Sequence, residues 1–155
     1  MPGRFQVAAN ALITRKDGKL LILKRKPDYD HDPDRWDTVS GRLEQDIENV
    51  RDELKREISE ELGNDFCCVI VAPFSTYNFY RGEDRKCEVI GVDYICMYYS
   101  GNIELSEEHT DYRWVKPEDF LKMDISGSLK RAVRIFIRVK DWYIANVGLF
   151  IDEVL

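Results

Sequence analysis

The feature that most constrains the fold is the segment at residues 41–63, GRLEQDIENVRDELKREISEELG. Its apolar residues recur at steps of three and four, which predicts an amphipathic helix over residues 48–62. The apolar residues of this stripe are Ile47, Val50, Leu54, Ile58 and Leu62. Asp46 is the candidate N-cap, and Gly63 is the C-terminal stop. Such a helix is stable only when a partner surface buries its stripe.

Strand-like segments that could supply this surface flank the helix. Runs rich in β-branched and aromatic residues predict strands at residues 5–14, 20–26, 36–40, 68–81, 87–100 and 111–115. Asp17-Gly18 predicts a two-residue type I′ turn between the first two strands. The polar sequence GEDRK predicts a loop between the two long strands.

Two further helices are predicted towards the C-terminus. One begins at Pro117 and covers residues 117–123, because proline suits the first helical position. The other is a long amphipathic helix over residues 128–147. The order of strands, helix, strands and helix predicts one mixed α/β domain, residues 1–155, with a helix packed on at least one sheet face.

The composition narrows the classes of partner. The chain has 155 residues and a net charge of −6, which disfavours broad binding to nucleic acid or to an anionic membrane. No apolar run reaches the roughly 20 residues of a membrane-spanning helix. The N-terminal residues MPGRFQVAAN lack a signal-peptide pattern, so a cytoplasmic protein is expected. The four cysteines match no zinc pattern and are interpreted as free, buried thiols.

The predicted helix carries an unusual concentration of negative charge near its end. Steps of three and four residues place Glu57, Glu60 and Glu61 on one face, where like charges repel. Acidic helix faces are usually just solvated. The alternative is a cation site, because Mg²⁺ and Mn²⁺ prefer oxygen ligands and bind one or two carboxylates together with phosphate oxygens.

The whole segment resembles the signature of the Nudix hydrolases, G-x5-E-x7-R-E-U-x-E-E-x-G-U, where U is a bulky aliphatic residue. Glu48 fills the isolated Glu position, and REISEELG at residues 56–63 matches the second half. The signature glycine falls on Arg42, directly after Gly41, and the final aliphatic position falls on Asn64. The resemblance implies a Nudix-type α/β/α sandwich with a mixed sheet between helices. It also implies a MutT-like pyrophosphohydrolase that uses Mg²⁺ or Mn²⁺.

The resemblance also assigns roles to individual residues. It implies that the metal is held by side chains and a backbone carbonyl of Gly41, Glu57, Glu60, Glu61 and Glu108. Glu57 is also a candidate general base, and His109 is a second one. Arg56 is expected to pair with Glu48 and to orient the catalytic turn, so both are counted with the catalytic residues.

Substrate contacts are predicted at three positions outside the signature. Arg25 suits a phosphate contact, and Trp36 and Tyr80 suit stacking on a nucleobase. The basic side of the last helix is either a solvated face or an aid to binding an anionic substrate. The expected substrate is a nucleoside diphosphate linked to another moiety, with nucleoside triphosphates first. A homodimer is a further implication of the resemblance, and a membrane or a stable nucleic-acid partner is not expected.

The alternative function is a catalytically weak nucleotide-binding or sensor module with a Nudix fold. In that case Arg42 would disable the loop before the helix, although all the acidic residues of the signature are present.

Overall fold

The computed structural model describes residues 4–81 and 85–151. Part of the predicted GEDRK loop, residues 82–84, lies outside the described residues. The elements follow the order predicted from the sequence, and both ends of the long strands agree with it to within one residue.

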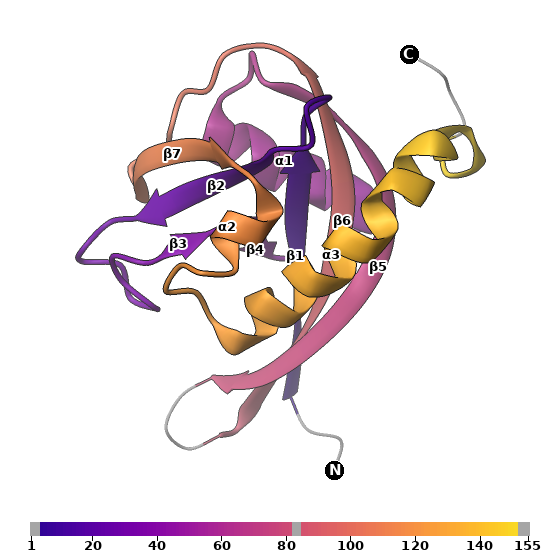
Figure 1. Ribbon diagram of the computed structural model, residues 1–155. Helices are drawn as coiled ribbons and strands as arrows, with labels where there is room; N and C mark the ends of the chain where they lie inside the picture. Colours follow the sequence, from indigo (N-terminus) through magenta and orange to yellow (C-terminus); the bar gives the residue numbers. More distant parts are fainter. Residues whose placement is uncertain (1–3, 82–84, 152–155) are drawn as a thin grey trace.

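The described strands form one mixed sheet (Figure 1). They are β1 (Arg4–Thr14), β2 (Leu20–Arg25), β3 (Trp36–Asp37), β4 (Val39–Arg42), β5 (Cys67–Arg81), β6 (Cys87–Ser100) and β7 (His109–Val115). Their order is β3-β2-β1-β6-β5, with β4 paired to β1 and β7 paired to β2. Only the β1–β6 pair is parallel among the described strands.

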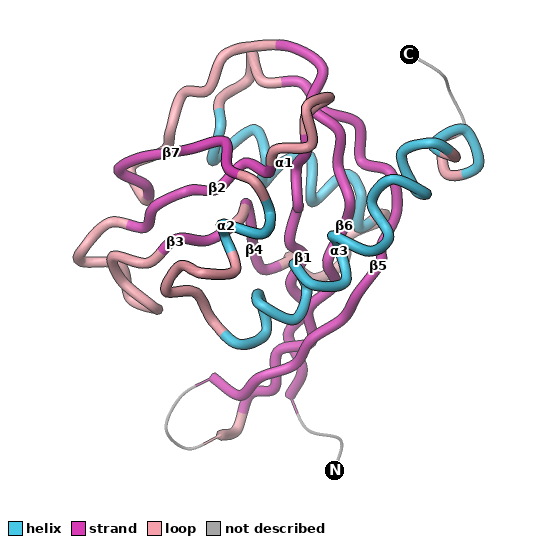
Figure 2. Tube along the Cα trace, viewed as in Figure 1, coloured by secondary structure: helices cyan, strands magenta, loops and turns pink. Residues whose placement is uncertain are grey.

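Helices cover both faces of this sheet (Figure 2). They are α1 (Val50–Leu62), α2 (Pro117–Phe120), α3 (Gly127–Ala145) and the short 3-10 helix η1 (Val147–Leu149). Alternate residues of β1 point to opposite faces. Ala11 and Ile13 pack with α1 in one apolar cluster, and Leu12 packs with α3 in the other. The predicted α/β/α sandwich is therefore confirmed.

The start of α1 differs from the prediction. The N-cap is Asn49, whose side-chain oxygen accepts a hydrogen bond of 2.8 Å from the backbone N–H of Arg51. Asp46 lies in a turn with φ 62°, and Glu48 precedes the helix. Ile47 belongs to the loop that packs near the N-terminal end of β1, so its fit to the helical period was coincidental.

The first hairpin also differs from the prediction. The backbone N–H of Gly18 donates to the carbonyl of Arg15, and Gly18 has φ 81° whereas Asp17 is not in the positive-φ region. A type I′ turn needs positive φ at both central residues, so the predicted turn type is wrong. The positive φ is carried by the glycine alone.

The single strand predicted at residues 36–40 is two strands, because β3 pairs with β2 whereas β4 pairs with β1. The remaining differences are small. Helix α2 ends at Phe120 rather than residue 123, and α3 ends at Ala145, before η1. All four cysteines are free, as predicted, although only Cys96 is fully buried.

Candidate active site

The three acidic residues of α1 differ sharply in burial. Glu61 is buried, with 5% of the residue exposed. The side chain of Glu57 is 13% exposed, whereas that of Glu60 is 57% exposed. Because the helix packs against the sheet through its apolar stripe, Glu57 and Glu61 turn inward and Glu60 remains at the surface. The predicted shared face is therefore divided between interior and solvent.

Arg56 binds the acidic side chains of its own helix. Its guanidinium donates to Glu57 (3.0 Å), Glu60 (2.7 Å) and Glu53 (2.9 Å). These bonds raise the pKa of Arg56 above its ordinary value, with the largest contribution from Glu53. The predicted pairing with Glu48 is wrong, because the helix begins after Glu48 and Glu53 takes its place.

Gly41 lies against the carboxylate of Glu57. A Cβ atom built on Gly41 would lie 2.0 Å from Cδ of Glu57, which no side chain can occupy. The next residue, Arg42, is exposed at the end of β4. The close approach therefore depends on Gly41, and a side chain at position 42 does not interfere with it.

Glu61 is the most unusual group of the site. Its Oε2 atom is buried and has no hydrogen-bond partner among the described residues. Nε2 of His109 lies 3.9 Å away, which is too far for a hydrogen bond. Burial raises the pKa of Glu61 well above its ordinary value, and the charges of Asp37, Glu57 and Glu108 raise it further.

His109 is uncharged at neutral pH. Burial lowers its pKa to about 4, and the positive charge of Arg25 acts in the same direction. Its side chain is 5% exposed at the start of β7, so it lies inside the protein rather than in the surface loop expected from the sequence. A neutral imidazole cannot neutralise Glu61.

The acidic side chains of the site offer carboxylate oxygens, the ligands that a hard divalent cation prefers. Glu57 and Glu61 are inward-facing carboxylates, and the charge of Glu108 raises the pKa of both. Within residues 4–81 and 85–151 no three acidic, His or Cys side chains are already arranged around a metal position. Two carboxylates completed by water and phosphate oxygens are a usual Mg²⁺ site, so the residues fit the ion that the signature implies.

A pocket of about 620 Å³ opens beside this acidic group. Gly41 and Glu108 line it together with Arg25 and Trp36, so the structure brings four of the predicted site residues to one cavity. The pocket is also lined by the N-terminal turn of α3 through Ser126 and Ser128. Its size falls within the usual range for small-molecule sites.

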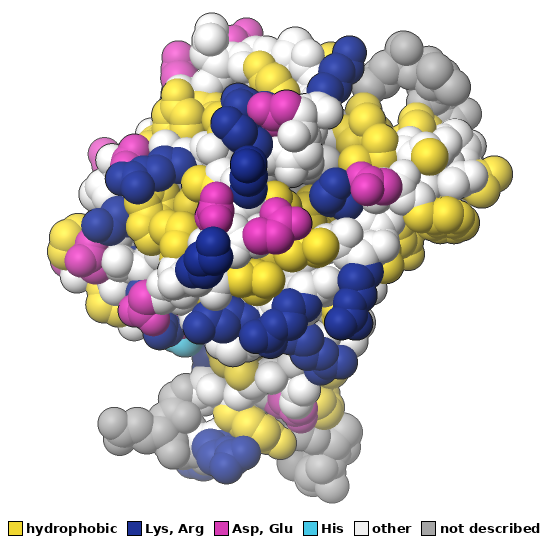
Figure 3. All heavy atoms as spheres, in the orientation of Figure 1, with side chains coloured by type: hydrophobic (Ala, Val, Ile, Leu, Met, Phe, Trp, Pro, Cys, Tyr) yellow, Lys and Arg dark blue, Asp and Glu magenta, His cyan; other side chains and the backbone are white. Residues whose placement is uncertain are grey.

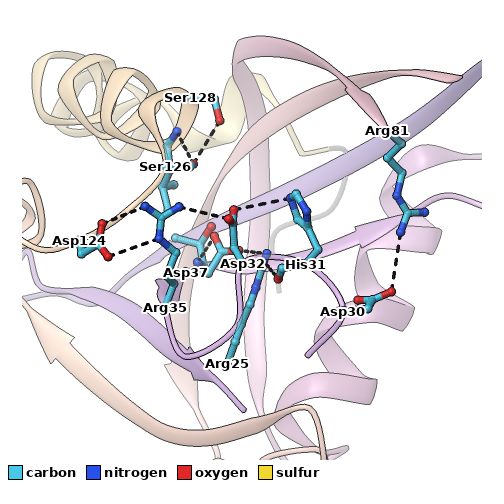
Figure 4. A network of polar contacts seen from close by, with 12 residues as sticks. Arg25, Asp30, His31, Asp32, Arg35, Asp37, Arg81, Asp124, Ser126 and Ser128 are labelled. Carbon is cyan, nitrogen blue, oxygen red and sulfur yellow. Dashed lines mark hydrogen bonds and ion pairs between the residues drawn. The ribbon is translucent and has the colours of Figure 1, made fainter. Parts of the chain in front are cut away.

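Ion pairs hold the wall and rim of this pocket (Figure 4). Arg25 pairs with Asp37 and donates to the backbone carbonyl of His31 at 2.6 Å. Arg35 connects Asp32 (3.2 Å) with Asp124 (2.9 Å). Arg25, the predicted phosphate contact, therefore lines the pocket in a position fixed by its own protein partners.

Further positive charge lies on α3, whose first turn lines the pocket. Figure 3 shows Lys and Arg side chains gathered over this helix. The exposed members are Arg131, Arg134 and Arg138. The charge of Arg131 reaches the pocket region, since it lowers the pKa of the buried Asp93.

The aromatic residues of the pocket differ from those expected. Tyr80 is 45% exposed, lies outside the pocket lining and carries the guanidinium of Arg85 over its ring at 4.4 Å. Tyr77 and Phe79 line the pocket instead, with their rings stacked at 6.2 Å. His31 stacks on the other side of Phe79 at 5.7 Å. The alternation of the strand could have identified this pair, since residues 77 and 79 share a face that residue 80 does not.

Comparisons with known proteins agree with this architecture. A family model described as NUDIX domain matches residues 4–134. The nucleoside triphosphatase NudI of Escherichia coli (strain K12 / DH10B) is 27% identical over 129 residues, which cover 79% of this chain and 91% of that protein. No helix within the described ranges has the length and apolarity needed to cross a membrane.

Solved structures show the same fold. The MutT protein from Methanosarcina mazei Go1 superposes with a TM-score of 0.75 at 23% identity, covering 90% of this chain and 98% of that one. The dihydroneopterin triphosphate pyrophosphohydrolase of E. coli superposes with a TM-score of 0.66 at 20% identity, covering 87% and 98%. With the family match over most of its length, this chain belongs to the NUDIX domain family and is a MutT-like enzyme of the pyrophosphohydrolase class.

Proposed function

We propose that this enzyme hydrolyses nucleoside triphosphates in the 620 Å³ pocket, with Mg²⁺ or Mn²⁺ held by Glu57 and Glu61. The products are a nucleoside monophosphate and pyrophosphate. The substrate class is supported by a relative named as a nucleoside triphosphatase and by a structural neighbour named as a triphosphate pyrophosphohydrolase.

One observation carries the proposal: the buried, unpartnered oxygen of Glu61. A buried carboxylate oxygen without a partner is unfavourable, because it loses its hydration, and the backbone hydrogen bond from Ser40 stabilises the Glu61 carboxylate only in part. Glu57 and Glu108 add negative charge to the same place. A divalent cation at this position would offset both costs, and a protein that needed only a stable fold would gain from an apolar residue there.

The bound ion would supply neutralisation of the phosphate charge and polarisation of the phosphorus–oxygen bonds. Glu108, on the pocket lining, is proposed as a further ligand, and the carbonyl of Gly41 as another. Glu60 is proposed as an outer contributor, since its carboxylate already accepts from Arg56.

The residues of the chain position the water and receive its proton. Water attacks a phosphorus of the triphosphate, a new P–O bond forms, and the anhydride P–O bond breaks with its electron pair leaving on pyrophosphate. Glu57, which faces inward and is fixed by Arg56, accepts the proton. Arg56 holds the Glu57 carboxylate in place, and Arg25 provides positive charge at the pocket wall.

Release of pyrophosphate and phosphate from a panel of nucleotides tests this function. We expect pyrophosphate release that requires millimolar Mg²⁺ or Mn²⁺. Glu57→Gln should lower kcat by about 10²- to 10⁴-fold, the range for loss of a general base. Glu61→Gln should raise the concentration of metal needed for half-maximal activity. Glu118→Gln, an exposed residue on α2, is the matched control and should match the wild type.

Full activity in the presence of a metal chelator, or in both Gln variants, would contradict the proposal. One observation favours the alternative sensor function: the Glu60 carboxylate accepts a hydrogen bond from Arg56. Among the described residues, Glu60 does not form a preformed metal cluster with two other acidic side chains. Nucleotides that raise the melting temperature without any turnover would support that alternative.

A further inference from the structure

A hydrogen-bonded chain of three side chains lies at the pocket and takes no part in the proposed hydrolysis. Asn10 on β1 donates from Nδ2 to Oδ1 of Asp93 on β6 at 2.9 Å. The hydroxyl of Tyr77 on β5 donates to Oδ1 of Asn10 at 3.1 Å. Asn10 and Tyr77 line the pocket, whereas Asp93 lies behind them and is 1% exposed.

The sheet fixes the positions of these three groups. Asn10 and Asp93 are direct partners in the parallel β1–β6 pair, and Tyr77 is the direct partner of Gly91 across β5 and β6. A Cβ on Gly91 would lie 1.9 Å from Cζ of Tyr77. The phenol ring therefore lies flat over the glycine, and its hydroxyl reaches Asn10 only because position 91 has no side chain.

The hydrogen-bond partners also fix which way the Asn10 amide faces. An ionised carboxylate only accepts hydrogen bonds, so the amide nitrogen must face Asp93. The amide oxygen can then accept from Tyr77. Exchanging the two ends would place the amide oxygen against the carboxylate, with no proton between them. The amide is thus held in one orientation, which a solvent-exposed asparagine is not.

This arrangement leaves part of the Asn10 amide available to a ligand. A primary amide has two N–H donors and an oxygen with two acceptor positions. Asp93 and Tyr77 use one of each, which leaves one N–H and one acceptor position for a group in the pocket. The edge of a nucleobase carries a donor beside an acceptor, and asparagine is well suited to pair with such an edge.

The order of donor and acceptor differs between two classes of base. Guanine and uracil carry a lactam edge, with a ring N–H beside a carbonyl. Adenine and cytosine carry the reverse, with a ring nitrogen acceptor beside an amino group. An amide that cannot turn over can satisfy only one order for a base held at a fixed position, because the other places donor against donor and acceptor against acceptor.

We propose that Asn10 is a specificity-determining residue that distinguishes lactam from amino bases, and that Asp93 and Tyr77 are positioning residues that hold its amide in one orientation. This inference rests on the proposed function, since it names the part of the nucleotide that the pocket reads. The ring of Tyr77, which lines the pocket beside Asn10, adds aromatic surface next to this amide.

The test compares GTP and UTP with ATP and CTP at about pH 8, where Asp93 is ionised because its pKa is raised only to about 6. The wild type should favour one class in kcat/KM by about 5- to 150-fold, the discrimination expected of one bidentate pair. Asp93→Asn offers the amide both a donor and an acceptor, so this preference should fall to within about threefold. Asn10→Leu should abolish it.

The decisive readout is the ratio between the classes, because a general loss of structure would not change it. In Asp93→Asn the change should appear in KM, with kcat for the favoured class within about threefold of the wild type. Tyr77→Phe keeps the ring and removes only the hydroxyl, so it should lower the preference partly. Tyr99→Phe removes an exposed hydroxyl on β6 and is the matched control.

A wild type without any preference, or a preference that persists unchanged in both Asp93→Asn and Asn10→Leu, would overturn the inference. Dissociation constants of the same four nucleotides give the same ratio without turnover. If no nucleotide is hydrolysed, the proposed function fails, while the ratio of dissociation constants still decides the role of Asn10.

Discussion

The position of the Glu57 carboxylate, the proposed base, depends on one absent side chain. Glu57 lies where the Cβ of residue 41 would be, so the backbone of β4 and the side chain of α1 are in direct contact. Arg42 is exposed and lines the pocket rather than this contact. At this site the important glycine is therefore the residue before the position that the family signature specifies.

This contact predicts opposite outcomes for two neighbouring substitutions. Gly41→Ala should displace the Glu57 carboxylate and lower kcat by at least about 10²-fold, because small errors in the position of a catalytic group are costly. Arg42→Ala should retain kcat within about threefold. Steady-state pyrophosphate release measures both, and the melting temperature shows whether Gly41→Ala remains folded. A folded, fully active Gly41→Ala would contradict the assignment.

The sequence predicted which residues carry the acidic groups of the site better than it predicted which side chains line the pocket. The signature singled out Glu57 and Glu61, which the structure turns inward, because its spacing is specific. It did not distinguish Tyr80 from Tyr77 and Phe79, since aromatic residues occur on both faces of β5. Register shifts between Ile70 and Ala72 and after Pro73 change which face a given residue of this strand occupies. Each shift reverses the alternation once, so the two together restore it, and local alternation still separates Tyr77 and Phe79 from Tyr80.

At the scale of elements, the cap of α1 holds the acidic helix at its correct length. Asn49→Ala removes the side-chain bond to the N–H of Arg51 and should cost about 1 kcal/mol of stability. For a domain of this size that corresponds to a melting temperature lower by about 2–4 °C. Thermal unfolding measures the change, with the exposed neighbour substitution Glu48→Ala as control. Equal melting temperatures for both variants would show that Asn49 is not the cap.

The body of α1 was predictable because its apolar residues repeat over several turns. Its start was not, because Asp46 and Asn49 are both good caps and Ile47 fits the helical period by chance. Asp46 lies in a turn with φ 62°, whereas Asn49 has the extended backbone of an N-cap, so the helix begins at Val50.

At the scale of the whole molecule, the buried Asp93 connects global stability to pH. Burial raises its pKa from 3.8 to about 6. The folded state then holds this proton more tightly than the unfolded state, so the free energy of unfolding falls as pH rises from about 4 to about 6. Between about pH 4.5 and about pH 7 the wild type should lose about 2 kcal/mol relative to Asp93→Asn.

Chemical denaturation of both proteins across this pH range measures that difference. A constant difference between the wild type and Asp93→Asn would show that Asp93 titrates as it does in the unfolded chain.

The pairing of β1 with β6 has a consequence for biosynthesis. The two partners Asn10 and Asp93 are 83 residues apart, and no local sequence pattern predicts their contact. While the chain is being made on the ribosome, the N-terminal strand has one open edge until residue 100 has emerged from the exit tunnel. Nascent chains that stop before Asp93 contain the entire acidic helix but lack the partner that holds the Asn10 amide.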